Sequence, residues 1–284
     1  MRAMALRQTR PARRRLLPID RKGSGPNLRR ELFTQLVLRD IRSRFVGSAS
    51  GWVWLFLTPL LLLAVYGLVF GVIFSARVPA GLEVPFIAWL AVALWPWLAF
   101  SEGTVRGAQA IRQHANLISK VSLPRHLLVA SSTSAVFVLH LLGYALVLFV
   151  LWAVMGVPLQ AGGILSLLFA LASLYLFALG LGLGLGALQV YLRDLEQFVP
   201  TFFLFWFFMT PILYPADMLP AFMSRWMAIN PMSNWMELIR SALLEGQMLP
   251  GLIDALVMLA SAAAALVIGG WLFMRLAPYF EDFL

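Results

Sequence analysis

Cysteine is absent from this chain of 284 residues, which also has only two lysines and three histidines. Without cysteine the chain has no disulfide framework, no thiolate nucleophile and no cysteine-based metal site. The histidines, His114, His126 and His140, are scattered and form no i, i+4 pair with a general-base glutamate, so no metal site is expected. Neither Lys22 nor Lys120 lies in a G-x-x-x-x-G-K-[ST] pattern, so the chain has no phosphate-binding loop of its own.

Charge is also scarce. Only 12% of the residues are charged, whereas 61% are apolar, and the mean hydropathy is +0.84. A soluble domain is about 45–50% apolar and about 25% charged. One soluble core could not bury the excess, and exposing it would make the protein aggregate. The composition therefore excludes soluble, disordered and disulfide-stapled proteins, and it predicts an all-α integral membrane protein.

The basic residues are concentrated at the N-terminus. Residues 1–44 carry thirteen Arg or Lys and three acids, a local charge of +10 against a net charge of +9 for the whole chain. A basic arm can indicate nucleic-acid binding, but at the start of a multispanning protein it marks the cytoplasmic side. We therefore expect no nucleic-acid partner. Residues 1–27 mix Arg, Pro, Gly and Ser, and they predict a flexible cytoplasmic tail without a cleavable signal peptide.

Residues 46–284 predict a permease domain of about six membrane spans. A hydrocarbon core of about 30 Å needs roughly 20 helical residues. The predicted spans are 45–76, 84–105, 127–155, 164–190, 197–214 and 252–275. Six spans place both termini on one side. With that side cytoplasmic, inner segments hold nineteen Arg or Lys and outer segments hold three, as the positive-inside rule requires.

Two segments outside the spans also have helical patterns. Residues 28–45 predict an amphipathic helix lying in the inner interface, with apolar residues at i, i+4 spacing and arginines on other faces. Its apolar residues are Phe33, Val37, Ile41 and Phe45. Residues 215–250 contain four prolines but also apolar runs, which favours re-entrant helices in the outer leaflet between spans five and six. The alternative is an extracellular loop that lies on the bilayer.

The spans offer little chemistry. Only Glu102 approaches a helix interior, so a proton-driven carrier is disfavoured. Asp194 and Glu196 lie beside Arg193 in a short inner loop, where a charged turn explains them. Gly180/Gly184 and Gly182/Gly186 form small-xxx-small pairs that predict close helix packing. Such a protein conducts passively or takes energy from a partner. Residues 106–126 are the best candidate to dock an ATPase, and the alternative there is a solvated connector.

Four stretches then resemble a known family. Gly47, Gly51, Trp54 and Pro59 match the G-x-x-x-G-x-x-W-x-x-x-x-P part of its pattern, and Arg44 lies three residues before Gly47. Residues 114–128, 191–215 and 230–244 follow in family order. The chain resembles the membrane subunit of ABC exporters of the second class, in the polysaccharide branch that moves lipid-linked O-antigen. The Arg-rich arm at 1–27 has no counterpart in that pattern.

The resemblance implies a transport subunit and not an enzyme. It implies a homodimer in the bacterial inner membrane, with two copies of a separate ATPase that holds the ATP and Mg, and with a polyprenyl-linked glycan as cargo. No cofactor is expected on this chain. The ATPase would meet the interface helix, including Arg44, and a coupling segment. The coupling residues are Arg112, His114, Asn116, Leu117, Ile118, Lys120 and Pro124.

The resemblance also suggests channel and gate residues, since aromatic faces suit sugar rings. The candidates are Trp95, Trp97, Phe202, Phe205, Trp206, Tyr214, Asn230 and Pro231. The alternative is that they are interfacial or packing residues. For the whole protein, the alternatives are an ABC permease for teichoic acid, capsule or drugs, a membrane enzyme acting on polyprenyl-linked sugars, and a passive channel.

Overall fold

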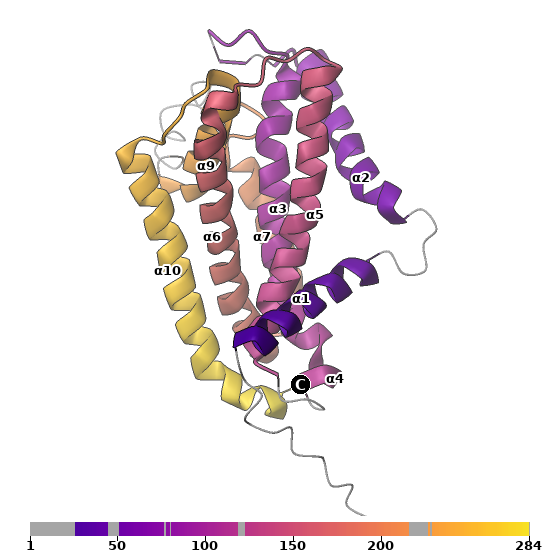
Figure 1. Ribbon diagram of the computed structural model, residues 1–284, viewed down its shortest axis with the longest axis vertical. Helices are drawn as coiled ribbons and strands as arrows, with labels where there is room; N and C mark the ends of the chain where they lie inside the picture. Colours follow the sequence, from indigo (N-terminus) through magenta and orange to yellow (C-terminus); the bar gives the residue numbers. More distant parts are fainter. Residues whose placement is uncertain are drawn as a thin grey trace, which may run out of the picture.

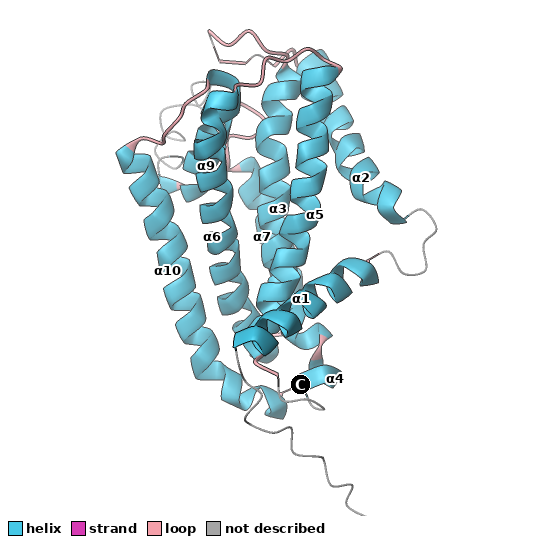
Figure 2. Cartoon of the chain, in the orientation of Figure 1, coloured by secondary structure: helices cyan, strands magenta, loops and turns pink. Residues whose placement is uncertain are grey.

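The computed structural model is a helical bundle, and no strand occurs in the residues that it describes (Figures 1 and 2). The described residues are 26–44, 51–76, 78, 79, 81–118, 123–215, 227 and 229–283. This architecture confirms the predicted all-α membrane protein. The predicted tail at 1–27 falls almost entirely outside the described residues and stays a prediction, as do the domain boundaries drawn from the sequence.

Four helices of the bundle are long and apolar enough to cross a membrane. They are α3 (Phe86–Gln113), α5 (Arg125–Ala153), α6 (Ile164–Tyr191) and α10 (Leu252–Leu276). At 1.5 Å per residue each is about 37 Å long or more, which exceeds a core of about 30 Å. Helix α6 packs against both α3 and α10, and α5 packs on α3. Helix α3 is the most buried of the four.

Two shorter apolar segments complete the bundle. Helix α2 (Gly51–Tyr66) continues as the π-helix η2 (Gly67–Ile73) and matches the first predicted span. Helix α7 (Leu195–Phe208) has 14 residues, about 21 Å, and so does not reach across the core alone. It ends six residues before the predicted boundary at 214. Pro211 explains the early end, because proline disfavours helical backbone in the residue before it.

Close helix packing depends on the predicted glycine pairs. A Cβ on Gly180 would lie 2.4 Å from the backbone of Ala265 on α10, and one on Gly269 would lie 2.0 Å from the Gly180 carbonyl oxygen. Gly182 and Gly186 instead face α3, where Gly107 lies against them. The two pairs therefore serve two different interfaces of α6, which confirms the packing prediction.

Helix α1 (Pro26–Ser43) crosses the bundle at the end where the C-terminal residues also lie, which we call the α1 end (Figure 1). It agrees with the predicted helix at 28–45, although Phe45 lies outside the described residues. Phe33, Val37 and Ile41 are half-buried toward α5, and Leu36 between them is buried. The exposed face carries the arginines, so the helix is amphipathic as predicted.

Helix α3 continues to Gln113, eight residues past the predicted end of its span. Residues 106–113 are therefore part of the bundle, which the sequence did not predict, and the placement of 106–126 on the inner side stays a prediction. The helix extends this far because of packing: Gly107, Ala108 and Ile111 are buried, and Gly107 lies against Thr133 of α5 and Gly182 of α6. The short α4 (Ala115–Ile118) follows, and residues 119–122, with Lys120, lie outside the described residues.

Helix α9 (Pro231–Arg240) and the π-helix η5 (Ser241–Glu245) lie in the segment where re-entrant helices were expected. Met232, Trp235 and Ile239 are fully buried, and α9 packs on α3, α6 and α10. It is thus part of the bundle and does not lie on its surface. Residues 216–226 and 228, in the rest of that segment, fall outside the described residues.

Candidate functional site

Glu102, on α3, holds three basic side chains near the α1 end. Its Oε1 accepts a hydrogen bond from Nη1 of Arg44 at 2.9 Å and lies 3.7 Å from Nε of Arg106. Its Oε2 lies 2.9 Å from Nε2 of His140 on α5. One carboxylate thus joins the residue after α1 to α3 and α5. With His140 neutral, the cluster keeps a net charge of +1.

Asp40 makes a second link between α1 and the bundle. The Ser132 hydroxyl on α5 donates to Oδ2 of Asp40 at 2.5 Å, and Nε2 of His114 lies 3.7 Å from Oδ1. Nδ1 of His114 donates to the Ala110 carbonyl at 2.9 Å, because a carbonyl can only accept. His114 therefore turns Nε2 toward α1. Asp40 and Glu102 together fasten α1 to the α3–α5 pair.

The predicted coupling residues that are described lie at the α1 end. Nη1 of Arg112 lies 2.6 Å from Oε2 of Glu196, in the first turn of α7. The charged turn expected at 193–196 therefore pairs with α3. On α4, Asn116 is exposed, Leu117 half-buried and Ile118 buried.

The start of α5, which comes after α4 in the sequence, contacts the C-terminal turn. Pro124 precedes α5. Arg125 then donates to the Ala277 carbonyl and to Glu281 of η6 (Ala277–Asp282). Arg112, before α4, thus pairs with α7, and Arg125, after it, pairs with the C-terminal turn. The coupling role of this segment stays a prediction.

The channel candidates on α3 and α7 separate into buried and exposed groups. Trp95 is buried and donates from Nε1 to the His140 carbonyl at 3.1 Å. Trp97 is buried against α7, with its ring 5.9 Å from that of Trp206. Phe202 and Phe205 are 43% and 63% exposed on the outward face of α7. In this single chain the exposed pair lies on the surface, Trp95 packs inside the bundle, and Trp97 packs against α7 at the wall of a pocket.

The remaining candidates form the junction between α7 and α9. Oδ1 of Asn230 accepts from Nε1 of Trp206 at 2.9 Å and from the Met232 amide at 3.1 Å, and so caps α9. Its Nδ2 donates to the Met209 carbonyl and to the Thr210 hydroxyl. The two remaining candidates flank this junction: Pro231 is the first residue of α9, and the Tyr214 hydroxyl donates to the Phe208 carbonyl at 2.6 Å.

Arg240, at the end of α9, is a structural residue that the sequence analysis did not select. It is 5% exposed and donates to the carbonyls of Pro211 at 2.7 Å and Ile212 at 2.9 Å. Its guanidinium lies 3.4 Å from the centre of the Trp89 ring, a cation–π contact. Arg240 thus fixes the chain that follows α7 onto α3.

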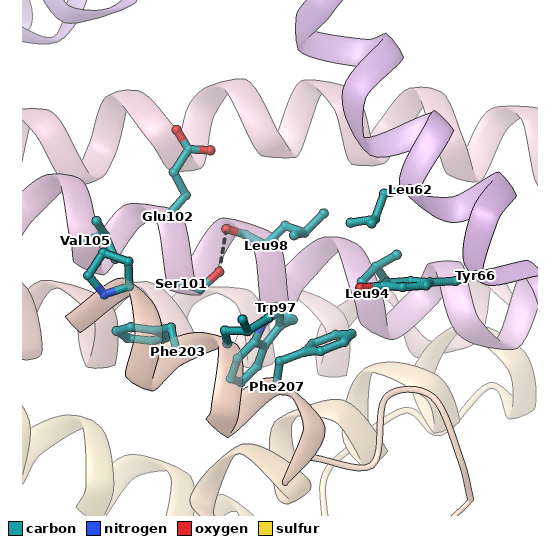
Figure 3. Close-up of a pocket in the computed structure, with 12 residues that line it drawn as sticks. Leu62, Tyr66, Leu94, Trp97, Leu98, Ser101, Glu102, Val105, Phe203 and Phe207 are labelled. Atoms are coloured by element: carbon teal, nitrogen blue, oxygen red, sulfur yellow. Dashed lines mark hydrogen bonds between the residues drawn. The ribbon is translucent and has the colours of Figure 1, made fainter. Parts of the chain in front are cut away.

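A pocket of about 310 Å³ lies between α2, α3 and α7 (Figure 3). Its wall is mostly aromatic and aliphatic, and Ser101 and Glu102 add polar groups at one end. Tyr66 of α2 stacks on Phe207 of α7 across it, with ring centres 5.9 Å apart. In Figure 3 Glu102 points away from Phe203, in keeping with its bond to His140. The described residues include no group of three His, Asp or Glu able to hold a metal ion.

Known proteins are similar to this chain over most of its length. Residues 31–244 match the family model described as ABC-2 type transporter. The chain is similar to the O-antigen export system permease protein RfbA of Myxococcus xanthus, with 33% identity over 249 residues that cover 84% of this chain and 88% of the relative. A protein of the same description from Klebsiella pneumoniae is 26% identical over 72% of this chain and 76% of its own length.

Proposed function

Since this chain belongs to the ABC-2 type transporter family, we propose that it is the permease of an exporter of lipid-linked polysaccharide of the O-antigen type. The cargo would cross the bacterial inner membrane from the cytoplasmic side. The observation that carries this proposal is the similarity to the Myxococcus xanthus permease, which runs through most of both chains. The family makes the chain a multi-pass transport subunit, not an enzyme, and gives it an ABC ATPase as partner.

The α1 end is the surface that would receive the ATPase. It carries the exposed arginines of α1 and the exposed Asn116 of α4. Asp40, Glu102 and Arg112 tie α1, α3, α5 and α7 together at this end. Elements linked in this way move together, so a displacement of α1 or α4 by the ATPase would reach the bundle. Two ATPase copies, each with ATP and Mg, would act on two copies of this chain, with both termini cytoplasmic.

The outward face of α7 is the surface that would meet the second copy. Its phenylalanines Phe198, Phe202, Phe205 and Phe208 are each between 43% and 63% exposed. Two such faces opposite each other would line a path with aromatic rings, whose apolar faces suit sugar rings. The junction of α7 and α9 at Asn230 would then control the far end of the path.

Deletion of the gene in its native host tests this function. Two pools are quantified: lipid-linked glycan inside the cell and glycan on the cell surface. If the chain exports the glycan, deletion should make lipid-linked glycan accumulate inside the cell and surface glycan disappear. A plasmid copy of the gene should restore both pools. Loss from both pools, with glycan synthesis by isolated membranes also lost, would favour the enzyme alternative. No change in either pool would reject this cargo and favour another substrate.

A further inference from the structure

We propose that a second pocket, at the end of the bundle opposite the α1 end, binds one neutral sugar residue of the cargo as the glycan leaves the permease. This pocket, which we call the Arg240 pocket, lies between the start of α3, the chain after α7, and α9 with η5 (Figure 1). The inference rests on the proposed function, because it takes the cargo to be a glycan. It adds a binding site and a preference for uncharged sugars.

A buried cation forms one wall of the Arg240 pocket. Arg240 is 5% exposed, yet within the described residues no carboxylate forms an ion pair with it. Its guanidinium donates to three backbone carbonyls at 2.7 to 3.3 Å, those of Trp89, Pro211 and Ile212. A guanidinium has five N–H groups, so these bonds leave two of them for a ligand. The structural contacts of Arg240 can therefore persist while it binds an acceptor in the pocket.

Two carboxylates line the same pocket. Glu237, on α9, and Glu245, at the end of η5, are both exposed. In the part of the chain that the structure describes, neither carboxylate forms an ion pair or a hydrogen bond. Acceptors and a donor thus line one cavity without satisfying each other. A ligand that fills the cavity must donate to the carboxylates and accept from the guanidinium.

A sugar meets both requirements, because each hydroxyl is a donor and an acceptor. The rest of the wall offers carbon surface for the C–H groups of a sugar ring, from Pro79, Leu82, Pro211 and Pro215. The volume of about 290 Å³ lies just below the range of small-molecule sites, about 300–1,000 Å³, which suits a single sugar residue. The two carboxylates and one guanidinium give the lining a net charge of −1. Neutral sugars are therefore favoured over uronic acids, whose carboxylates would meet like charge.

Close contacts hold the element that carries the second carboxylate. The Gln160 amide, before α6, donates to the Leu243 carbonyl of η5 at 2.8 Å. Gly163 allows this approach, since a Cβ there would lie 1.8 Å from the Ala242 carbonyl oxygen. Gly246 then ends η5 with a φ of 78°, which glycine adopts without steric cost. The site is thus formed before the ligand arrives, which reduces the entropy lost on binding.

Binding of lipid-free oligosaccharides to the purified permease–ATPase complex in phosphatidylcholine nanodiscs tests the site. The probe is the surface glycan of the native host cut into short pieces, and calorimetry gives its affinity. Glu237→Ala with Glu245→Ala should weaken binding at least tenfold. Glu83→Ala with Asp254→Ala removes the same charge from exposed positions at this end of the bundle, outside the pocket lining, and should leave binding unchanged. Leu82→Trp fills the pocket and should also weaken binding at least tenfold.

Several results would overturn the assignment. These are wild-type affinity in the Glu237/Glu245 variant, an equal loss in the Glu83/Asp254 control, or binding of trigalacturonic acid as tight as that of the probe. Equal competition by phosphoethanolamine would indicate a site for a zwitterionic lipid headgroup instead. If the wild-type complex exports glycan in vesicles but does not bind the oligosaccharides, this assignment fails and the proposed function stands. If gene deletion leaves both glycan pools unchanged, the proposed function and this assignment fail together.

Discussion

Arg112 and Glu196 are 84 residues apart in the sequence, yet Nη1 of the first lies 2.6 Å from Oε2 of the second. The pair joins the end of α3 to the first turn of α7. A carboxylate in that turn also interacts favourably with the helix dipole. Two elements at the α1 end are thus coupled directly, without a residue from α5 or α6 between them.

We predict that Arg112→Glu lowers ATP-driven export several-fold while membrane insertion and fold are retained. The pair is partly exposed, and such pairs contribute only about 0.2–1 kcal/mol to stability, so the effect falls on coupling. Export per ATP hydrolysed is the measurement. Glu196→Arg in the same chain should restore it, and Arg193→Glu, in the exposed turn beside α7, is the charge-matched control. Wild-type export in the single variant would contradict the coupling role.

The link between Asp40 and Ser132 should be measurable as a coupling energy. Asp40→Ala and Ser132→Ala each remove one partner of a partly buried hydrogen bond, which costs about 1–3 kcal/mol. The double variant should lose less than the sum of the single variants. Thermal unfolding in detergent gives the values. Thr34→Ala, on the exposed side of α1, is the control and should change little. Strict additivity would mean that this contact does not hold α1.

Close approach of α6 and α10 predicts a sharp contrast between two glycines. A Cβ on Gly180 would meet the α10 backbone at 2.4 Å, whereas one on Gly270 would meet nothing within 4 Å. Gly180→Ala should therefore destabilise the protein by about 1–3 kcal/mol through overpacking, and Gly270→Ala should not. Denaturation of the two variants in parallel checks this. Equal stabilities would show that the interface can separate without cost.

Arg240 should not be replaceable by lysine. Its guanidinium spans the carbonyls of Pro211 and Ile212 while lying on the Trp89 ring. An ammonium cannot make this planar set of contacts, and each buried carbonyl left unpaired costs about 1–3 kcal/mol. Arg240→Lys should thus lower the unfolding midpoint clearly. Arg275→Lys, at an exposed position near the end of α10, is the matched control. Similar midpoints for the two variants would refute the role of Arg240.

The sequence predicted the long helices because each is an apolar run between polar or proline-rich breaks. It failed where tertiary packing decides the boundary. Gly107 and Ile111 extend α3 because they are buried, and the interior position of α9 depends on neighbours that no local pattern reveals.

The site was predictable only in part. Glu102 was identified as the one acid near a helix interior, and its neighbour Arg106 follows from i, i+4 spacing. Arg44 and His140 come from distant parts of the chain, and hydrophobic periodicity does not specify such pairing. Arg240 lies in the stretch 230–244 that resembles the family, but its carbonyl partners exist only once the chain after α7 folds back onto α3.

The most direct measurement of the central claim is transport by the purified permease and its ATPase in sealed vesicles. Labelled lipid-linked glycan is supplied on the ATPase side, and its appearance on the other side is followed with ATP and with a non-hydrolysable analogue. The account predicts transfer with ATP but not with the analogue, and transfer several-fold slower in the Arg112→Glu variant. Transfer that is independent of ATP would show a passive channel, and chemical conversion of the glycan without transfer would show an enzyme.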